Sequence, residues 1–192
     1  MCRWYLLAAA FACVLGGSWG QIISWGSCPT VQVQQNFNIA RYMGPWYEQK
    51  RYFAVFEAGM ECVSAEYTLE TGGVVKVNNT GYRRISGRYS SAIGDAIVED
   101  PREPAKLGVR FSEYQPRGDY WVLSTDYDTY TVIWSCTPFA RFFNTQFAWI
   151  LTRNAQGVPD SKMAELYSLL DGYGIHTWKL LTTDQSPASC PM

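Results

Sequence analysis

Charged residues are scarce in this sequence, and their two signs nearly cancel. Asp, Glu, Lys and Arg make up only 17% of the 192 residues, with 16 basic residues against 17 acidic ones. A protein that neutralises the phosphates of DNA or RNA needs clustered Lys and Arg in clear excess. No nucleic acid is therefore expected as a partner.

Histidine is almost absent as well, since His176 is the only one in the chain. A Ser-His-Asp or Cys-His catalytic site would have to be assembled around this residue, which follows the predicted C-terminal helix. A surface histidine is the simpler interpretation, so we expect no enzyme. The cysteines show neither Cys-x-x-Cys spacing nor clustering with histidine, and no metal site is expected.

No apolar run reaches the ~20 residues that a membrane-spanning helix needs. Near the N-terminus, residues 5–15 are apolar, follow Arg3 and precede the small residues Ser18 and Gly20. This pattern is typical of a secretory signal peptide cleaved before Gln21, rather than of an uncleaved anchor. We expect residues 1–20 to be the signal peptide, residues 21–192 to form one domain, and the mature protein to be secreted and extracellular.

Removal of this signal peptide leaves four cysteines, an even number in a chain bound for an oxidising compartment. Two disulfides are therefore predicted. Four cysteines allow three connectivities, and the sequence alone does not choose among them. The residues concerned are Cys28, Cys62, Cys136 and Cys190.

Alternation of apolar and polar residues dominates the mature chain. It is clearest in residues 63–70, where Val63, Ala65, Tyr67 and Leu69 form the apolar set of a strand with one face in a core. A hairpin turn is predicted at Gly72-Gly73. Further strands are predicted at residues 46–55, 74–79, 91–99, 105–114, 120–125, 130–136 and 146–153.

Helical spacing of apolar residues occurs only after Pro159, between Met163 and Leu170. Asp160 or Ser161 can cap the start of this helix, and Gly172 and Gly174 suit its end. Eight short antiparallel strands fit a β-sandwich or an up-and-down β-barrel, and a barrel of eight strands encloses one small ligand. The helix would pack on the outside.

Three short motifs mark the ends of predicted strands. Gly44-Pro45-Trp46 opens the first strand, Thr125-Asp126-Tyr127 closes the sixth, and Arg153 closes the eighth. In a barrel these ends meet at one closed mouth, where a guanidinium laid over an indole gains about 0.5–2 kcal/mol. We expect Arg153 to cover Trp46 in a structural role, with Asp126 as a turn residue.

Side-chain alternation then assigns residues to the barrel interior. If Arg153 points inward, Leu151, Trp149 and Phe147 share its face. An aromatic content of 16% supplies more large rings than a closed end needs. Trp149 is therefore expected in a cavity.

Asn78-Asn79-Thr80 is an N-glycosylation sequon, and its acceptor Asn78 must face water to be modified. The outward assignment of Asn78 places its neighbours Val77 and Asn79 inside the barrel. Glycosylation is expected at Asn78.

The three motifs at this spacing, together with the four cysteines, resemble the lipocalin family, specifically its three-motif kernel members of the apolipoprotein D-like type. The wider runs at residues 36–48, 120–127 and 147–151 carry the likeness, which extends from about residue 28 to residue 191. The resemblance implies an all-β fold: an eight-stranded antiparallel up-and-down β-barrel with one C-terminal α-helix packed outside. It also implies a protein that binds and transports a small hydrophobic ligand, namely a lipid, steroid or fatty acid.

The resemblance assigns residues too. Tyr67, Asn79 and Trp149 would face the ligand, and Tyr42 would lie near the pocket floor; the interior positions Phe147 and Val77 complete the predicted ligand site. The implied disulfides are Cys28–Cys136 and Cys62–Cys190.

Two alternatives keep this fold and change its use. In the first, the cavity carries a bilin or carotenoid chromophore, on which Trp149 and Tyr67 would stack as readily as on a sterol. In the second, aromatic side chains fill the pocket and a partner docks outside. The sequence does not discriminate between these, and apart from a non-covalent apolar ligand no cofactor is expected.

Three phenylalanines, Phe139, Phe142 and Phe143, surround Arg141 in the predicted loop between the last two strands. This loop would lie at the open mouth of the barrel. The rings would either touch a lipoprotein or membrane surface or fold back over the entrance.

Overall fold

The computed structural model describes residues 22–139 and 141–191, so the predicted signal peptide lies outside the described residues. Short helical elements are α2 (Ile39–Tyr42), η1 (Val55–Glu57) and η2 (Thr177–Lys179), and the long helix is α3 (Asp160–Gly172). The strands are β1 (Ile22–Trp25), β2 (Gly44–Arg51), β3 (Met60–Leu69), β4 (Val75–Arg83), β5 (Arg88–Val98), β6 (Lys106–Arg110), β7 (Gly118–Thr125), β8 (Tyr130–Phe139), β9 (Phe143–Thr152) and β10 (Leu181–Thr182).

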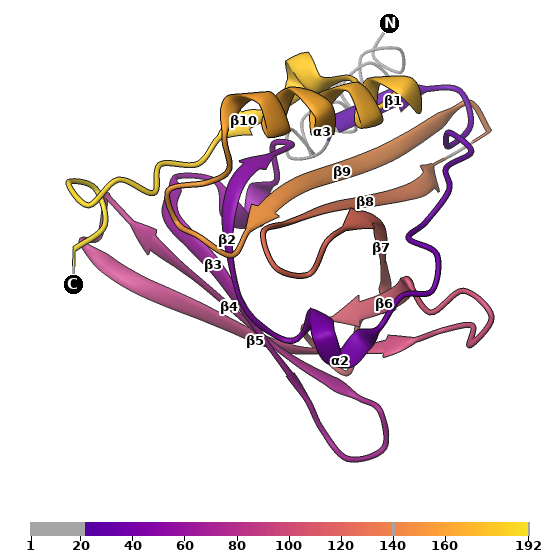
Figure 1. The fold of residues 1–192 in the computed structure, drawn as a ribbon, viewed down its shortest axis with the longest axis horizontal. Helices are drawn as coiled ribbons and strands as arrows, with labels where there is room; N and C mark the ends of the chain where they lie inside the picture. The colour runs from indigo at the N-terminus through magenta and orange to yellow at the C-terminus, as the bar shows by residue number, and fades with distance from the viewer. Residues whose placement is uncertain (1–21, 140, 192) are drawn as a thin grey trace, which may run out of the picture.

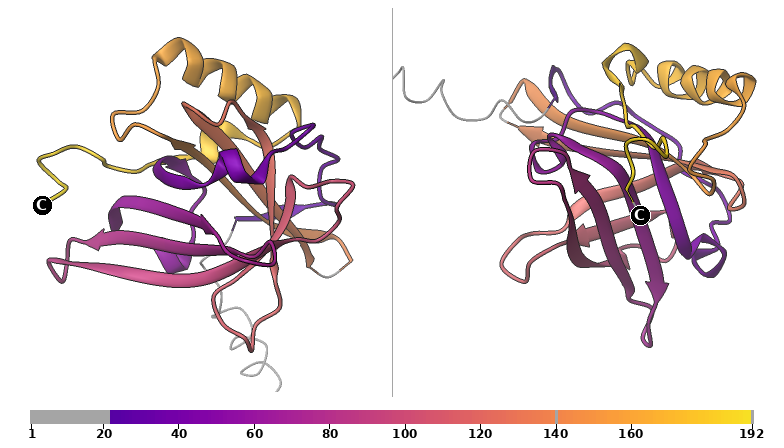
Figure 2. Two further views of the ribbon diagram at one scale, coloured as in Figure 1. Left: turned by 60° about the horizontal axis from the view of Figure 1, so that its bottom comes forward. Right: turned by 90° about the vertical axis from the view of Figure 1, so that its left-hand side faces the viewer.

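Strands β2 to β9 pair antiparallel with their sequence neighbours, and β9 pairs back onto β2 with Tyr47 opposite Thr152. The sheet is thereby closed into the expected eight-stranded up-and-down barrel, and the β-sandwich is excluded (Figures 1 and 2). The short strands β1 and β10 extend the sheet along β9 and β2.

The predicted strand boundaries differ from the structure at the open end. β4 and β5 run on to Arg83 and Arg88, well past the expected limits of residues 79 and 91. Polar residues on both faces hide this extension from a periodicity argument. Conversely, β6 ends at Arg110, because Phe111 and Tyr114, which suggested a longer strand, lie exposed in the following loop.

The apolar set predicted for the third barrel strand is right except at its end. Val63, Ala65 and Tyr67 are buried, but Leu69 is 38% exposed. Leu69 leads into the β3–β4 hairpin, where Gly72 and Gly73 both have positive φ angles of 85° and 82°. These two angles are easy for glycine, so the predicted turn is in place.

Helix α3 packs outside the barrel, across the outward face of β9 (Figure 1). Leu166 and Leu170 share one buried cluster with Ala148 and Ile150 of β9. The predicted cap by Asp160 or Ser161 is wrong: Pro159 occupies the N-cap position, no side chain caps the helix, and Asp160 already lies in the first turn. None of the helices in residues 22–139 and 141–191 is long and apolar enough to cross a membrane.

Candidate functional site

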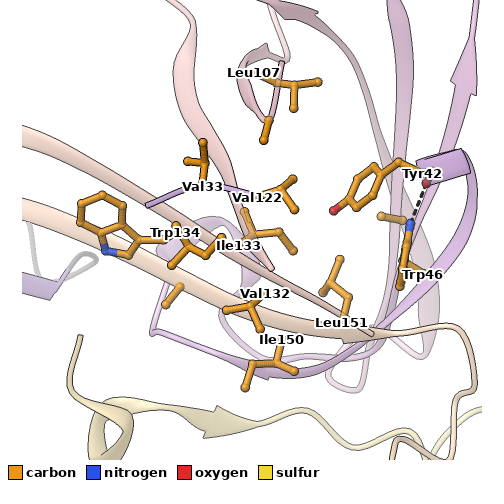
Figure 3. Close-up of a cluster of buried hydrophobic side chains, with 14 of the residues drawn as sticks. Val33, Tyr42, Trp46, Leu107, Val122, Val132, Ile133, Trp134, Ile150 and Leu151 are labelled. Carbon is orange, nitrogen blue, oxygen red and sulfur yellow. Dashed lines mark hydrogen bonds between the residues drawn. The ribbon is translucent and has the colours of Figure 1, made fainter. Parts of the chain in front are cut away.

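The closed end of the barrel is built around Trp46, which is completely buried (Figure 3). The Arg153 guanidinium lies 3.7 Å from the Trp46 ring centroid, and the indole N–H donates to the Tyr42 carbonyl at 2.9 Å. Gly44 has φ 93°, and a Cβ there would stand 3.3 Å from Arg153 Nη1. The motif residues of the first and last barrel strands therefore meet as the sequence predicts.

Arg153 also joins separate segments of backbone at this end. Its guanidinium donates to five carbonyl oxygens, those of Arg41, Tyr42, Met43, Pro45 and Tyr127. All of its polar contacts are with backbone oxygens, which fits a structural role.

The third motif shapes the β7–β8 turn. Thr125 Oγ1 accepts from Tyr127 N at 2.9 Å and donates to the Tyr130 carbonyl at 2.7 Å. Partial burial raises the pKa of Asp126, but hydrogen bonds from Thr129, Tyr130 and Asp128 outweigh burial and hold that pKa below its usual value. Asp126 lies in the turn, as expected, and stabilises it as a carboxylate.

Above the closed end lies a cavity of about 750 Å³ that opens among the loops at the other end of the barrel. It is lined by β3, β4, β7 and β9 and by the loop that carries η1. All six predicted ligand-site residues line it: Tyr42, Tyr67, Val77, Asn79, Phe147 and Trp149.

One wall of the cavity is aromatic. Trp149 and Phe147 stack with centroids 5.6 Å apart and ring planes 16° apart, and Phe56 follows 5.8 Å from Phe147. The Trp149 indole N–H donates to Glu57 Oε2 at 3.3 Å, which fixes the ring orientation. This wall is a flat apolar surface with one polar edge.

The cavity floor is a hydroxyl network. Tyr120 Oη lies 2.9 Å from the hydroxyls of both Tyr42 and Tyr67, and Tyr42 Oη lies 3.0 Å from Thr131 Oγ1. Burial raises the pKa of Tyr67 to about 12 and that of Tyr42 further, so both stay neutral in physiological solution. Tyr120 was not predicted as a site residue, because the sequence pattern did not assign the inward face of its strand.

Two further polar atoms in the cavity wall lack partners. Asn79 Oδ1 and Ser90 Oγ are buried, and no hydrogen-bond partner for either exists among the described residues. Unsatisfied buried polar atoms cost free energy. A ligand with a hydroxyl or carbonyl group could satisfy them.

A buried charged cluster of Glu48, Arg51 and Glu57, to which Thr183 adds a hydroxyl, borders the same cavity, and Glu48 and Glu57 line it. Arg51 Nη1 donates to Glu48 Oε1 at 2.5 Å and to Thr183 Oγ1 at 2.9 Å, and Arg51 Nε lies 3.9 Å from Glu57 Oε2. Burial raises the pKa of Glu48 against the effect of Arg51. Burial and the Glu48 charge raise the pKa of Glu57 to about 8.

This cluster was not predicted from the sequence. A signal was present, because Glu48 shares a strand face with the inward residue Trp46, and an acid at an inward position requires a partner. Its partners come from η1 and from the segment after β10, which strand periodicity does not place.

Both disulfides implied by the resemblance are present in the structure. Cys28–Cys136 ties the N-terminal arm to β8, and Cys62–Cys190 ties the C-terminal tail to β3. The described parts of both terminal segments are thereby tied to the barrel wall.

The three phenylalanines near the open mouth lie differently from the prediction. Phe139 and Phe143 are the paired end residues of β8 and β9, because both strands run further than their patterns indicated. The rings do not line the cavity, so they do not fold back over its entrance. Instead, Phe142 and Phe143 pack against Trp25 and remain 53% and 37% exposed.

Asn78 lies in the middle of β4, between the cavity-lining residues Val77 and Asn79 but not itself in the lining. Strand alternation therefore places its side chain on the outer face of the barrel, where the residue is half-buried and its Oδ1 is enclosed without a partner among the described residues. His176 is exposed and stacks on Trp178.

Comparisons with known proteins agree with this architecture. A family model described as "Lipocalin-like domain" matches residues 37–185. Apolipoprotein D of Cavia porcellus is 38% identical over 186 residues, which cover 97% of this chain and 96% of the relative.

Two solved structures show the same fold at lower identity. Lobster apocrustacyanin A1 superposes with a TM-score of 0.77 at 21% identity, covering 89% of this chain and 95% of its own. Insecticyanin from the tobacco hornworm Manduca sexta has a TM-score of 0.76 at 23% identity, covering 89% and 93%. Given the family match over most of its length and the three motifs assembled at its closed end, this chain belongs to the lipocalin family.

Proposed function

We propose that this chain is a secreted carrier that holds one small apolar ligand, a lipid, steroid or fatty acid, in its barrel cavity. The observation that carries the proposal is the cavity itself, about 750 Å³ in volume, with a stacked aromatic wall and a hydroxyl floor. Small-molecule sites of about 300–1,000 Å³ are typically apolar with a few polar groups that fix orientation.

The expected affinity follows from ligand size. A ligand of about twenty heavy atoms at ~0.3 kcal/mol per atom gains ~6 kcal/mol, which corresponds to a Kd of roughly tens of micromolar. Better shape complementarity would bring binding below micromolar. Such affinities suit transport or buffering, because the ligand must also be released.

Fluorescence titration tests the proposal. The purified protein is titrated with progesterone, arachidonate, retinoic acid and biliverdin while tryptophan emission is followed, because Trp149 lies in the cavity wall. Saturable quenching is expected with at least one of them. If none quenches, and mass spectrometry finds no lipid co-purifying with the native protein, the cavity is not used and an outer-surface interaction is favoured instead.

The same preparation tests the chromophore alternative. Phe147 and Trp149, stacked in the wall, present flat rings on which a conjugated bilin or carotenoid would also lie. A coloured protein with a visible absorption band would identify that cargo. A colourless protein that binds steroid or fatty acid would retain the lipid proposal.

The proposal extends to a lipoprotein or membrane surface as the place of ligand exchange. Trp25 (76% exposed) and Phe139 (58%) lie at the open end beside Phe142 and Phe143, close to Arg141. Exposed aromatic groups with a basic neighbour suit a lipid interface. Phe142→Ser should reduce co-sedimentation with phospholipid vesicles, and undiminished co-sedimentation would contradict this use of the patch.

Secretion and glycosylation at Asn78 complete the proposal. The two disulfides support passage through an oxidising compartment. Expression in a secreting eukaryotic cell should give a protein in the medium that begins at Gln21 and loses mass on treatment with N-glycosidase. Asn78→Gln should abolish that loss.

A further inference from the structure

The charged cluster beside the cavity contains two carboxyl groups and only one guanidinium. Two carboxylates, Glu48 and Glu57, share the single guanidinium of Arg51. Glu48 takes the close contact, while Glu57 Oε2 stands 3.9 Å from Arg51 Nε. A buried carboxylate without a full counter-charge must bind a proton or a cation.

Both terminal nitrogens of Arg51 are committed to other groups, and its remaining donor, the Nε–H, stands 3.9 Å from Glu57 Oε2, beyond hydrogen-bond distance. Its Nη1 donates to Glu48 and Thr183, and its Nη2 donates to the carbonyls of Glu57 and Met60. The guanidinium is held by four groups from three separate segments. It cannot turn towards Glu57 without breaking buried hydrogen bonds.

Glu57 itself faces the cavity. The residue is only 8% exposed and lines the cavity. Its Oε2 accepts from the Trp149 indole, whereas no group in the described part of the chain donates to Oε1. The carboxyl group therefore has an open position directed into the space that a ligand would fill.

The surroundings of this position suit a cation. Trp149 contacts this carboxyl group through its indole N–H, Phe147 stacks on Trp149, and Phe56 follows Phe147 along the same wall; aromatic faces attract ammonium groups. Two basic residues, Arg83 and Arg110, also line the cavity. They are the last residues of β4 and β6 and lie at the open mouth. A carboxylate head group would find its counter-charge there and not beside Glu57.

We propose that Glu57 is a cation subsite of the cavity, and that this chain prefers an amphiphilic amine, with its ammonium on Glu57 and its apolar body against Phe147 and Trp149. This inference rests on the proposed function, because it requires that the cavity holds an apolar ligand at all. It adds the chemical class of the ligand and the residue that selects it.

Proton linkage gives the subsite a distinct signature. The groups that face Glu57 are Glu48 and Arg51 of β2, Trp149 of β9 and Tyr67 of β3. Since the pKa of Glu57 is raised to about 8, its carboxyl group is mostly protonated at pH 7. An incoming ammonium ion displaces that proton to solvent, so amine affinity should rise with pH, by up to about tenfold per unit below the pKa.

Three probes of equal chain length test the inference: dodecylamine, dodecanol and dodecanoate, each below its aggregation concentration. Isothermal titration calorimetry in two buffers of different ionisation enthalpy measures affinity and proton release together. For the wild type at pH 7 we expect dodecylamine to bind at least about tenfold more tightly than dodecanoate, with release of up to one proton. Dodecanol should bind without proton release.

Glu57→Gln keeps the shape and removes the titratable carboxyl group. We expect this variant to lose at least about tenfold in dodecylamine affinity, to lose the proton release, and to change by less than about twofold for dodecanol. Glu66→Gln, on the exposed outer side of β3, is the matched control and should behave as wild type.

The outcomes distinguish a failure of the cation subsite from a failure of the carrier function. If dodecanol binds but dodecylamine binds no more tightly than dodecanoate, or binds without proton release, the cation subsite is wrong and the carrier function stands. If none of the three probes binds, the carrier function itself is wrong. Should Glu57→Gln fail to fold, the proton release and pH trend of the wild type still decide the question.

Discussion

At the scale of single residues, two pairs of an aromatic and a charged side chain have different roles in the barrel. Arg153 covers Trp46 and binds the carbonyls of the closed end, so this pair stabilises the fold. Trp149 and Glu57 form the second pair, with the indole N–H on the carboxylate, and both line the open cavity. The first pair should therefore matter for stability and the second for binding.

Trp46→Ala should lower the free energy of unfolding by ~3–5 kcal/mol. The indole is completely buried, and large-to-small changes in a core lose both transfer free energy and packing. Chemical denaturation at 25 °C measures the change. Trp178→Ala, at a position 79% exposed, is the control and should shift stability by less than about 0.5 kcal/mol. Equal stabilities of the two variants would contradict this assignment.

Trp149→Ala should weaken ligand binding by roughly tenfold, or ~1.4 kcal/mol, with little loss of fold. The ring borders the cavity and its loss leaves the closed end intact. Equilibrium binding of whichever ligand binds wild type measures the effect, with circular dichroism to show that the barrel is retained. An affinity equal to that of wild type would remove Trp149 from the site.

Glu57 should make the protein less stable as the pH rises from about 5 to 8. The folded state raises its pKa to about 8, so between the unfolded and folded pKa values the native state binds more protons than the unfolded state. Under that condition stability falls with rising pH. Thermal unfolding at several pH values should show a smaller fall for Glu57→Gln than for wild type; parallel curves would contradict the raised pKa.

At the scale of elements, β9 shows what periodicity reveals and what it hides. Its inward residues Phe147 and Trp149 were placed in the cavity by alternation alone, because a strand repeats every two residues. The outward residues Ala148 and Ile150 are also buried, under α3. Elements too short to show a period, such as β1 and the two-residue β10, could not be predicted this way.

Leu170→Ala should cost ~2–5 kcal/mol, because this side chain is fully buried between α3 and the barrel. Ligand affinity should stay unchanged, since Leu170 lies outside the cavity. Urea denaturation and a binding titration measure the two effects. Leu181→Ala, at a position 45% exposed, is the matched control. A loss of binding equal to the loss of stability would mean that α3 shapes the cavity.

At the scale of the whole molecule, the barrel and its cavity follow from strand pattern and motif spacing, but the charged cluster does not. Glu48, Glu57 and Thr183 come from three segments that only the closed fold brings together. Because these residues lie in separate segments of the sequence, no local sequence pattern predicts the cluster. The open-end phenylalanines illustrate the same limit, because their packing on Trp25 depends on a strand that the sequence did not reveal.

Removing the Cys62–Cys190 disulfide should lower stability by about 4–5 kcal/mol in the chain-entropy model, because it closes a loop across 128 positions of sequence. The double variant Cys62→Ser with Cys190→Ser, compared with wild type by chemical denaturation, measures this. A loss below about 1 kcal/mol would mean that hydrogen bonds such as Gln185 Nε2 to the Glu48 and Val63 carbonyls hold the tail unaided.

The contact of Thr183 with Arg51 and Glu48 bears on how the chain folds. The first barrel strand, β2, must wait for β9 before the sheet can close, and its Arg51 must wait longer for the hydroxyl of Thr183, 132 positions further along the chain. Chains with such distant contacts fold slowly. On the ribosome the cluster of Glu48 and Arg51 therefore stays incomplete until residue 183 has emerged, and ligand loading belongs after that point.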